Sequence, residues 1–202
     1  MIKRILEALL MAASEPLSLD YLHKLVISNG IDIEKRDVRR FLDELTQDYQ
    51  ERAVELKEVA SGYRLQVRQD MATWVNKLWE EKPPRYSRAF LETLAIIVYK
   101  QPATRAEIEE VRGVSVSSNI IKTLLEHGWI KVVGYKEVPG RPALYATTAK
   151  FLDYFNLRSL AELPSLQDAV EIAVAETESE IIAETAEELL AAQEPQDLIE
   201  EM

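Results

Sequence analysis

Cysteine is absent from the 202 residues, and only two histidines occur, His23 and His127. Without cysteine the chain forms no disulfide and no thiolate nucleophile, which suits a reducing cytoplasm. The two histidines lie far apart and no His-Glu-x-x-His spacing occurs, so we expect no metal site. No apolar run is long enough to cross a bilayer, and no signal-peptide cleavage site follows the N-terminus. We therefore expect a soluble, cytoplasmic protein without membrane attachment.

Glycine is almost as scarce, with six residues in the whole chain. Four of them follow helical patterns or form turns, one lies in a strand pattern and one in a hairpin loop: Gly30, Gly62, Gly113, Gly128, Gly134 and Gly140. None remains for a phosphate-binding loop, and Gly-Lys-Ser/Thr does not occur. The sequence Gly-Val-Ser-Val-Ser at 113–117 lacks the last glycine of a nucleophile elbow, and no strand precedes it. We expect no cofactor and no enzymatic activity.

Basic residues are missing from one end of the chain. Residues 161–202 contain 13 acidic residues and no lysine or arginine, and the last 38 residues contain no aromatic residue. The body, 1–160, holds 22 acids against 24 bases and so carries a net charge of +2. This composition predicts that residues 165–202 form an acidic tail, either disordered or a solvated helix.

Periodicity in the second half predicts three helices followed by a hairpin. An apolar helix over 90–99 ends before Pro102, and Thr104 and Glu107 have the spacing of a capping box. A short helix then ends at Gly113, and a third helix covers 117–127. The period changes to two in the strand patterns 130–136 and 143–147. This order of elements is that of a winged helix.

The first half repeats the order. Helical patterns cover 2–13, 18–29 and 35–49, strand patterns cover 53–59 and 63–67, and a last helix covers 71–79. In that last helix we expect Trp74, Val75 and Leu78 to face the core. Residues 81–85 form the linker, and its two prolines at 83–84 keep it extended and stiff. The predicted fold class is α+β, mostly helical, with two tandem winged-helix domains at 1–82 and 83–164 and the acidic tail at 165–202.

A winged helix binds DNA, another protein or a second copy of itself, so the fold leaves the function open. Sequence readout of DNA requires arginine, lysine or amide side chains on the third helix. In the second half this helix offers only Asn119 and Lys122, and in the first half the bases are interspersed with acids. Three bases of the second hairpin, Lys131, Lys136 and Arg141, can touch phosphates without reading sequence. A DNA-binding transcription regulator is therefore the alternative, and protein recognition is favoured.

Two surfaces are candidates for protein contacts. Pro139-Gly140 suits the centre of a type II turn, after which we expect Arg141 to be extended before Pro142. We expect three exposed side chains of the second domain to bind a partner: Arg112, Arg141 and Tyr145. In the first domain a broad apolar stripe predicts a dimer interface of Ile2, Ile5, Leu6 and Leu9.

Short motifs in one order across the second half resemble the segregation and condensation protein B family. They are residues 92–97, 99–102, 104–109, 112–114, 139–142, Tyr145, 147–148, 151–155 and 163–164. The chain departs from the family pattern at Asn156, where glycine is usual, and at Tyr135, where a base is common. Asparagine tolerates the left-handed conformation that such a glycine adopts.

The resemblance implies a non-catalytic accessory subunit of the bacterial SMC–kleisin condensin, acting in chromosome condensation and segregation. It further implies a homodimer joined through the N-terminal domains, and binding to the kleisin, segregation and condensation protein A, by the C-terminal domain. Through the kleisin it implies contact with the SMC ATPase, indirect or weak contact with chromosomal DNA, and a place at the nucleoid.

Overall fold

The computed structural model describes residues 1–78 and 86–165. The predicted linker at 81–85, Trp79 and nearly all of the predicted acidic tail lie outside this part of the chain. The described part is mostly helical, with two small antiparallel sheets. Residues Met1–Glu162 form one compact unit, so the predicted boundary between residues 82 and 83 stays a prediction.

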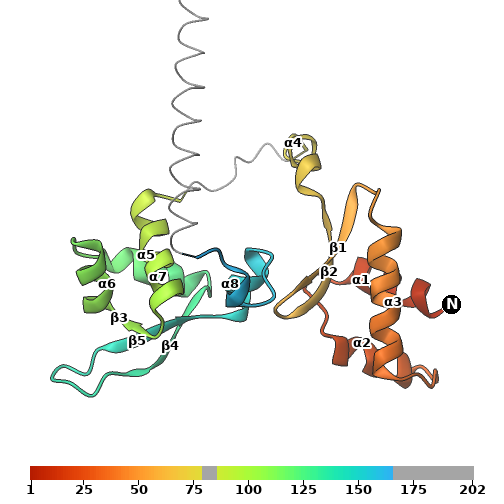
Figure 1. The fold of residues 1–202 in the computed structure, drawn as a ribbon, viewed down its shortest axis with the longest axis horizontal. Coiled ribbons are helices and arrows are strands. Elements are labelled where there is room, and N and C mark those ends of the chain that lie inside the picture. Colours follow the sequence, from red (N-terminus) through yellow and green to blue (C-terminus); the bar gives the residue numbers. More distant parts are fainter. Residues whose placement is uncertain (79–85, 166–202) are drawn as a thin grey trace, which may run out of the picture. The chain divides into compact units, whose positions relative to one another are not determined.

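The N-terminal half consists of three helices and a hairpin (Figure 1). These elements are α1 (Ile2–Ala12), α2 (Leu19–Ser28), α3 (Lys35–Asp48), β1 (Val54–Val59) and β2 (Gly62–Val67). Ser18 caps α2 as expected, because its hydroxyl accepts a hydrogen bond from the amide of Tyr21 at 3.2 Å. The predicted helices and strands are confirmed within about one residue at each end, a difference typical of helix termini.

The core of this half is formed by one face of each helix and the inner face of the hairpin. Its fully or nearly fully buried members are Leu6, Leu10, Leu22, Val26, Val38, Leu42, Leu45, Tyr49, Leu56 and Tyr63. Leu6 was expected at a dimer interface, but its side chain is fully buried in this core, and the dimer interface stays a prediction. Ile2 and Leu9 are partly buried against the same core, and Ile5 is also partly buried. Of the four predicted interface residues, Ile2, Ile5 and Leu9 therefore keep some exposed surface and Leu6 keeps none.

Leu17, just before α2, forms an isolated β-bridge with Tyr63 of the hairpin. Leu17 and Tyr63 exchange two backbone hydrogen bonds of 2.9 Å. This close approach requires glycine at position 62, where φ is +143° and a Cβ atom would lie 2.2 Å from the carbonyl oxygen of Leu17. Gly62 is therefore needed for the turn and also for the close approach of the Leu17 and Ser18 backbone, just before α2.

The last predicted helix of this half is much shorter than expected. The turn η1 (Gln69–Met71) leads into α4 (Ala72–Val75), which lies beyond the end of the hairpin (Figure 1). Trp74 is 70% exposed and Leu78 is 75% exposed, so the expectation that they face the core is wrong. Val75 is half-buried. Four helical residues at the end of a hairpin do not present a continuous apolar face to the core.

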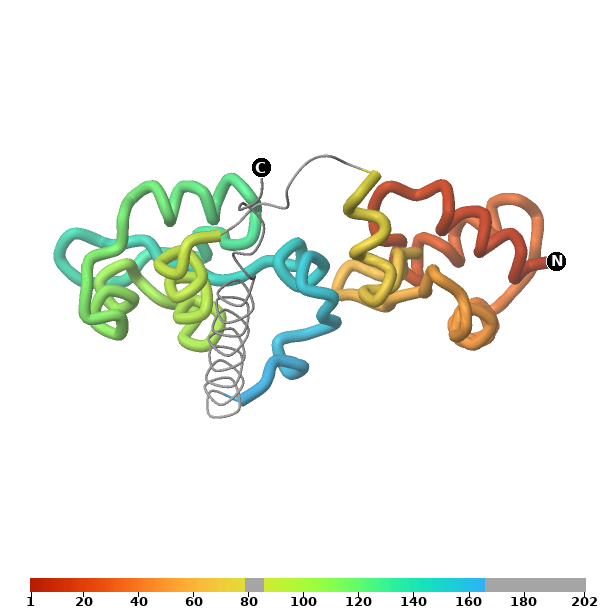
Figure 2. The backbone as a smooth tube through the Cα atoms, turned by 90° about the horizontal axis from the view of Figure 1, so that it is seen from above, coloured from red at the N-terminus to blue at the C-terminus, as the bar shows by residue number. Residues whose placement is uncertain are grey.

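The C-terminal half repeats three helices and a hairpin and adds a short strand between the first two helices. Figure 2 follows the chain through these helices into the hairpin. The elements are α5 (Arg88–Lys100), β3 (Ala103–Thr104), α6 (Arg105–Arg112), α7 (Ser118–Glu126), β4 (Ile130–Tyr135), β5 (Ala143–Thr147), α8 (Ala149–Tyr154) and η2 (Leu160–Glu162). The sheet order is β3-β5-β4. Strand β3 was not predicted, because two residues show no periodicity.

Aromatic rings fill the core between α5, α8 and the start of β4. Trp129 is 2% exposed, and its ring lies 4.5 Å from that of Tyr154, 4.9 Å from His127 and 5.3 Å from Tyr86. His127, which directly follows α7, is half-buried, and its ring stacks on that of Trp129. Asn156, after α8, has a φ of +60°, which confirms that asparagine adopts the left-handed conformation there.

Candidate partner-binding surface of the C-terminal half

Helix α6 begins at a complete capping box. A carboxylate oxygen of Glu107 accepts hydrogen bonds from the Thr104 amide at 2.7 Å and the Thr104 hydroxyl at 2.8 Å. The Thr104 hydroxyl accepts one from the Glu107 amide at 3.3 Å. The other carboxylate oxygen lies 2.6 Å from the ammonium of Lys136, at the end of β4. The ion pair therefore links the start of α6 to the hairpin.

These contacts all favour the charged form of Glu107. The hydrogen bond from Lys136 and those from Thr104 lower the pKa of the Glu107 carboxyl to about 2, against an ordinary 4.5. Because the pKa is lowered by folding, the contribution of Glu107 to stability is fully present above its unfolded pKa. It is lost as the pH falls from about 4.5 to about 2.

Replacing Glu107 by glutamine is expected to lower the free energy of unfolding near neutral pH. The difference from the unmodified protein should shrink as the pH falls from about 4.5 to about 2. Urea titrations at several pH values between 7 and 2 measure it. Glu110→Gln is the matched control, because Glu110 is exposed and has no hydrogen-bond or ion-pair partner among the described residues. A pH-independent difference for Glu107→Gln would contradict the assignment.

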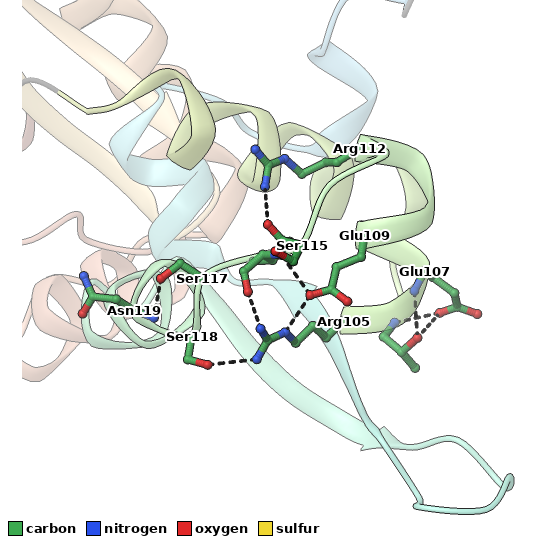
Figure 3. A network of polar contacts seen from close by, with 10 residues as sticks. Arg105, Glu107, Glu109, Arg112, Ser115, Ser117, Ser118 and Asn119 are labelled. Atoms are coloured by element: carbon green, nitrogen blue, oxygen red, sulfur yellow. Dashed lines mark hydrogen bonds and ion pairs between the residues drawn. The ribbon is translucent and has the colours of Figure 1, made fainter.

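The loop at 113–117, between α6 and α7, is held by polar contacts from α6 (Figure 3). Glu109 accepts a hydrogen bond from the Val116 amide at 2.9 Å and one from Arg105 Nε at 3.0 Å. The Val116 amide and Arg105 lower the pKa of the Glu109 carboxyl. Arg105 also donates to the Val116 carbonyl and, at 2.9 Å, to the Ser118 hydroxyl. The loop is therefore fixed by contacts at its C-terminal end.

Arg112 lies at the other end of this loop and is not the exposed side chain that the sequence suggested. Its side chain is only 7% exposed, and one of its terminal nitrogens lies 3.2 Å from a carboxylate oxygen of Glu92 on α5. Its Nε atom is buried without a hydrogen-bond partner. The side chain is buried because α5 packs against α6, which a linear sequence does not reveal. The expected exposure of Arg112 is wrong, and its contact with a partner stays a prediction.

Arg141 is exposed in the β4–β5 turn, as expected. The Arg141 amide donates to the Val138 carbonyl at 2.9 Å, and Gly140 has a φ of +86°, two features of the predicted type II turn. Arg141 itself has a φ of +38°, so the extended conformation expected before Pro142 is wrong. The chain must keep turning at Arg141, because the Pro142 carbonyl accepts a hydrogen bond from the backbone amide of Lys136 on the opposite side of the hairpin. The guanidinium pairs with Glu137 at 3.1 Å.

Tyr145 is half-buried in the middle of β5, opposite Ala103 on β3 and Val132 on β4. The three predicted partner-binding residues thus come from the end of α6, the hairpin turn and the centre of the sheet. Among the described residues, no hydrogen bond or ion pair joins any two of them. They do not form a single polar cluster.

A groove beside β3 was missed by sequence reasoning. Its cavity of about 390 Å³ is lined by Lys100, Pro102, Ala103, Glu107, Glu110 and Val111. Pro102, Ala103 and Val111 supply apolar surface, and Val111 is exposed. Lys100 and Glu110 carry opposite charges, and neither has a hydrogen-bond or ion-pair partner in the part of the chain that the structure describes. Such a lining suits a peptide segment that carries both an apolar side chain and charges.

Within residues 1–78 and 86–165, no cluster of three or more His, Asp or Glu side chains is arranged to hold a metal ion. In the same residues, no helix is both long enough and apolar enough to cross a membrane.

Comparison with known proteins identifies the family. Residues 4–166 match the model of the segregation and condensation complex subunit ScpB. The chain belongs to the ScpB family. It is 56% identical over 170 residues to a segregation and condensation protein B homologue of Coxiella burnetii, covering 84% of this chain and 81% of the relative. It is 47% identical over 167 residues to segregation and condensation protein B of Symbiobacterium thermophilum, covering 82% and 74%.

Two solved ScpB structures are also similar in sequence. ScpB from Mycobacterium tuberculosis is 32% identical, with 76% of this chain and 94% of that chain covered and a TM-score of 0.35. A dimer of a ScpB N-terminal domain complexed with a ScpA peptide is 29% identical, with 38% and 91% covered and a TM-score of 0.34.

Membership in the ScpB family confirms the resemblance found in the sequence. The chain is a ScpB subunit of the SMC condensation complex, which acts in chromosome segregation and condensation, and it is not an enzyme. The alternative of a transcription regulator is therefore not supported.

Proposed function

We propose that this ScpB chain is a homodimer that binds the kleisin ScpA through the groove beside β3 and the neighbouring hairpin. In this proposal residues 1–82 and 83–164 are two winged-helix domains, of which the first dimerises and the second binds the kleisin. The complex acts at the nucleoid in the cytoplasm, and the kleisin connects the chain to the SMC ATPase. Charge in the acidic tail keeps DNA contact weak or indirect.

The groove beside β3 is the observation that carries kleisin binding. Contacts within the chain hold its rim in place, because the capping box and the Lys136–Glu107 ion pair join the start of α6 to the hairpin. A preorganised surface loses less conformational entropy on binding. Its unpaired charges, Lys100 and Glu110, are available to a partner segment, and exposed Val111 supplies an apolar contact.

The three residues predicted from the sequence have different roles in this proposal. Arg141 contacts the kleisin directly, because its guanidinium is exposed in the hairpin turn. Tyr145 lies opposite Ala103, which lines the groove, and so supports the groove from the centre of the sheet. Arg112 positions the loop at 113–117 through its bond to the Ser115 carbonyl and its ion pair with Glu92.

A direct role in DNA binding has little support in the hairpin. Lys136 is paired with Glu107 and Arg141 with Glu137, so two of its three bases are already neutralised. We therefore expect at most weak and salt-sensitive binding to DNA, without sequence preference.

Arg141→Ala is expected to weaken kleisin binding by about 1–3 kcal/mol, which is the range of an ordinary interface hot spot. The thermal unfolding midpoint should change little, because the turn bond between Val138 and the residue 141 amide uses only backbone atoms. Calorimetry with purified ScpA and the full chain measures both affinity and stoichiometry.

Lys122→Ala is the matched control for this experiment. Lys122 is also an exposed base with an acidic partner four residues away, but it lies on α7 and not at the groove. Unchanged affinity for Arg141→Ala would remove Arg141 from the interface. If Val111→Glu in the groove also left the affinity unchanged, the proposed binding surface would be wrong.

A further inference from the structure

The N-terminal half leaves an apolar groove open on α1. We call it the α1 groove; its cavity of about 640 Å³ is lined by Met1, Arg4, Ile5, Ala8 and Leu9. These residues recur at intervals of three and four, so they share one side of the helix. Leu6 and Leu10 point into the core instead. Ala8 is small and leaves space between the longer side chains of the neighbouring turns.

The same half also exposes large apolar side chains in the segment 69–78, which we call the arm. Trp74 and Leu78 are both exposed, and Asp70 precedes Trp74 by four residues. The arm therefore exposes a carboxylate on η1, an indole on α4 and an isobutyl group just after α4. Lys77 lies over the Trp74 ring at 5.3 Å and leaves the other ring face uncovered by this contact.

Groove and arm are complementary in charge as well as in polarity. Arg4, on the groove, and Asp70, on the arm, are both exposed. Neither has a hydrogen bond or ion pair with another described residue. An arm laid along α1 with Trp74 near Ala8 brings a free carboxylate to a free guanidinium. An exposed tryptophan that fills an apolar groove is also the typical anchor of a protein interface.

We infer that the arm of one protomer occupies the α1 groove of a second copy of this chain. The inference rests on the proposed homodimer and names the contact that holds it together. In a twofold dimer the contact occurs twice, because each protomer supplies one arm and one groove. The chain's own arm does not line its own groove, and its Trp74 stays exposed.

A charge exchange tests the Arg4–Asp70 contact in the full chain. Arg4→Asp and Asp70→Arg are each expected to raise the dimer dissociation constant by about tenfold or more, because each places like charges together at two symmetric contacts. The double variant Arg4→Asp/Asp70→Arg restores the ion pair, so its dimer dissociation constant should return most of the way to that of the unmodified chain. Sedimentation of all four proteins completes this double-mutant cycle. Strictly additive losses in the double variant would overturn the inference.

Disulfide trapping provides a second readout, since the chain contains no cysteine of its own. The double variant Arg4→Cys/Asp70→Cys should form a cross-linked dimer on mild oxidation, and each single variant should form much less. Met11→Cys/Asp70→Cys is the matched control, because Met11 is an exposed residue of α1 outside the groove. A disulfide within one chain, or equal cross-linking of the control, would show that the arm lies elsewhere.

Trp74→Ala separates this inference from the proposed homodimer. We expect it to raise the dimer dissociation constant by about 30-fold or more, as removal of an interface hot spot does. The arm contact is wrong and the homodimer stands under two results together. Trp74→Ala and the charge-exchange variants dimerise as tightly as the unmodified chain, and Arg4→Cys/Asp70→Cys does not cross-link. If the unmodified chain sediments as a monomer at tens of micromolar, both are wrong. If ScpA fills the α1 groove instead, Ile5→Glu weakens ScpA binding, Trp74→Ala leaves the dimer intact, and the inference is again overturned.

Discussion

Trp129→Ala is expected to lower the free energy of unfolding by about 3–5 kcal/mol, the cost of removing a large buried aromatic side chain. Trp129 is among the largest fully buried side chains of the described residues. Its ring contacts rings from α5, from α8 and from His127, the residue after α7, so its loss leaves a cavity where several elements meet. Urea denaturation followed by circular dichroism measures the change.

Tyr135→Ala is the control for Trp129→Ala, because Tyr135 is an aromatic residue of the same hairpin that is largely exposed. Its effect should stay below about 1 kcal/mol, the usual range for a strand residue on the surface. Equal effects of the two substitutions would contradict the aromatic core.

Gly62→Ala is expected to destabilise the N-terminal half by about 2–5 kcal/mol. A Cβ atom at this position would lie 2.2 Å from the Leu17 carbonyl oxygen and 2.6 Å from the Ser18 amide nitrogen. Both are backbone atoms, which cannot rotate away as the end of a side chain does. Overpacking costs about 1–3 kcal/mol, and a positive φ adds about 1–2 kcal/mol for a residue with a side chain.

Gly113→Ala isolates the conformational part of that cost. Gly113 also has a positive φ, +72°, but a Cβ atom there would meet nothing within 4 Å. We expect a loss of about 1 kcal/mol at this C-cap. Thermal and urea denaturation of the two variants measures the difference between them. If Gly62→Ala were no more harmful than Gly113→Ala, the backbone contact with Leu17 would not constrain the hairpin.

Local chemistry explains what the sequence by itself determined about this protein. The capping box of Thr104 and Glu107, the left-handed Gly113 and the turn at Pro139–Gly140 were all predicted and are confirmed. Each depends on residues no more than four positions apart, so the sequence contains both partners of every interaction. The same short motifs, in one order along the chain, are also what indicated the ScpB family.

Tertiary structure alone decided which side chains remain accessible. Leu6 and Arg112 were expected on the surface and are buried, whereas Trp74 and Leu78 were expected in the core and are exposed. A helical pattern shows that an apolar side exists but not which neighbour covers it.

Contacts between distant segments were also invisible in the sequence. The Lys136–Glu107 ion pair spans 29 residues, and the Leu17 backbone approaches Gly62 although α2, α3 and β1 lie between them in the sequence. The groove beside β3 exists only because α5, α6 and the sheet meet there. Partners so far apart are brought together by packing of the whole core, which no local pattern records.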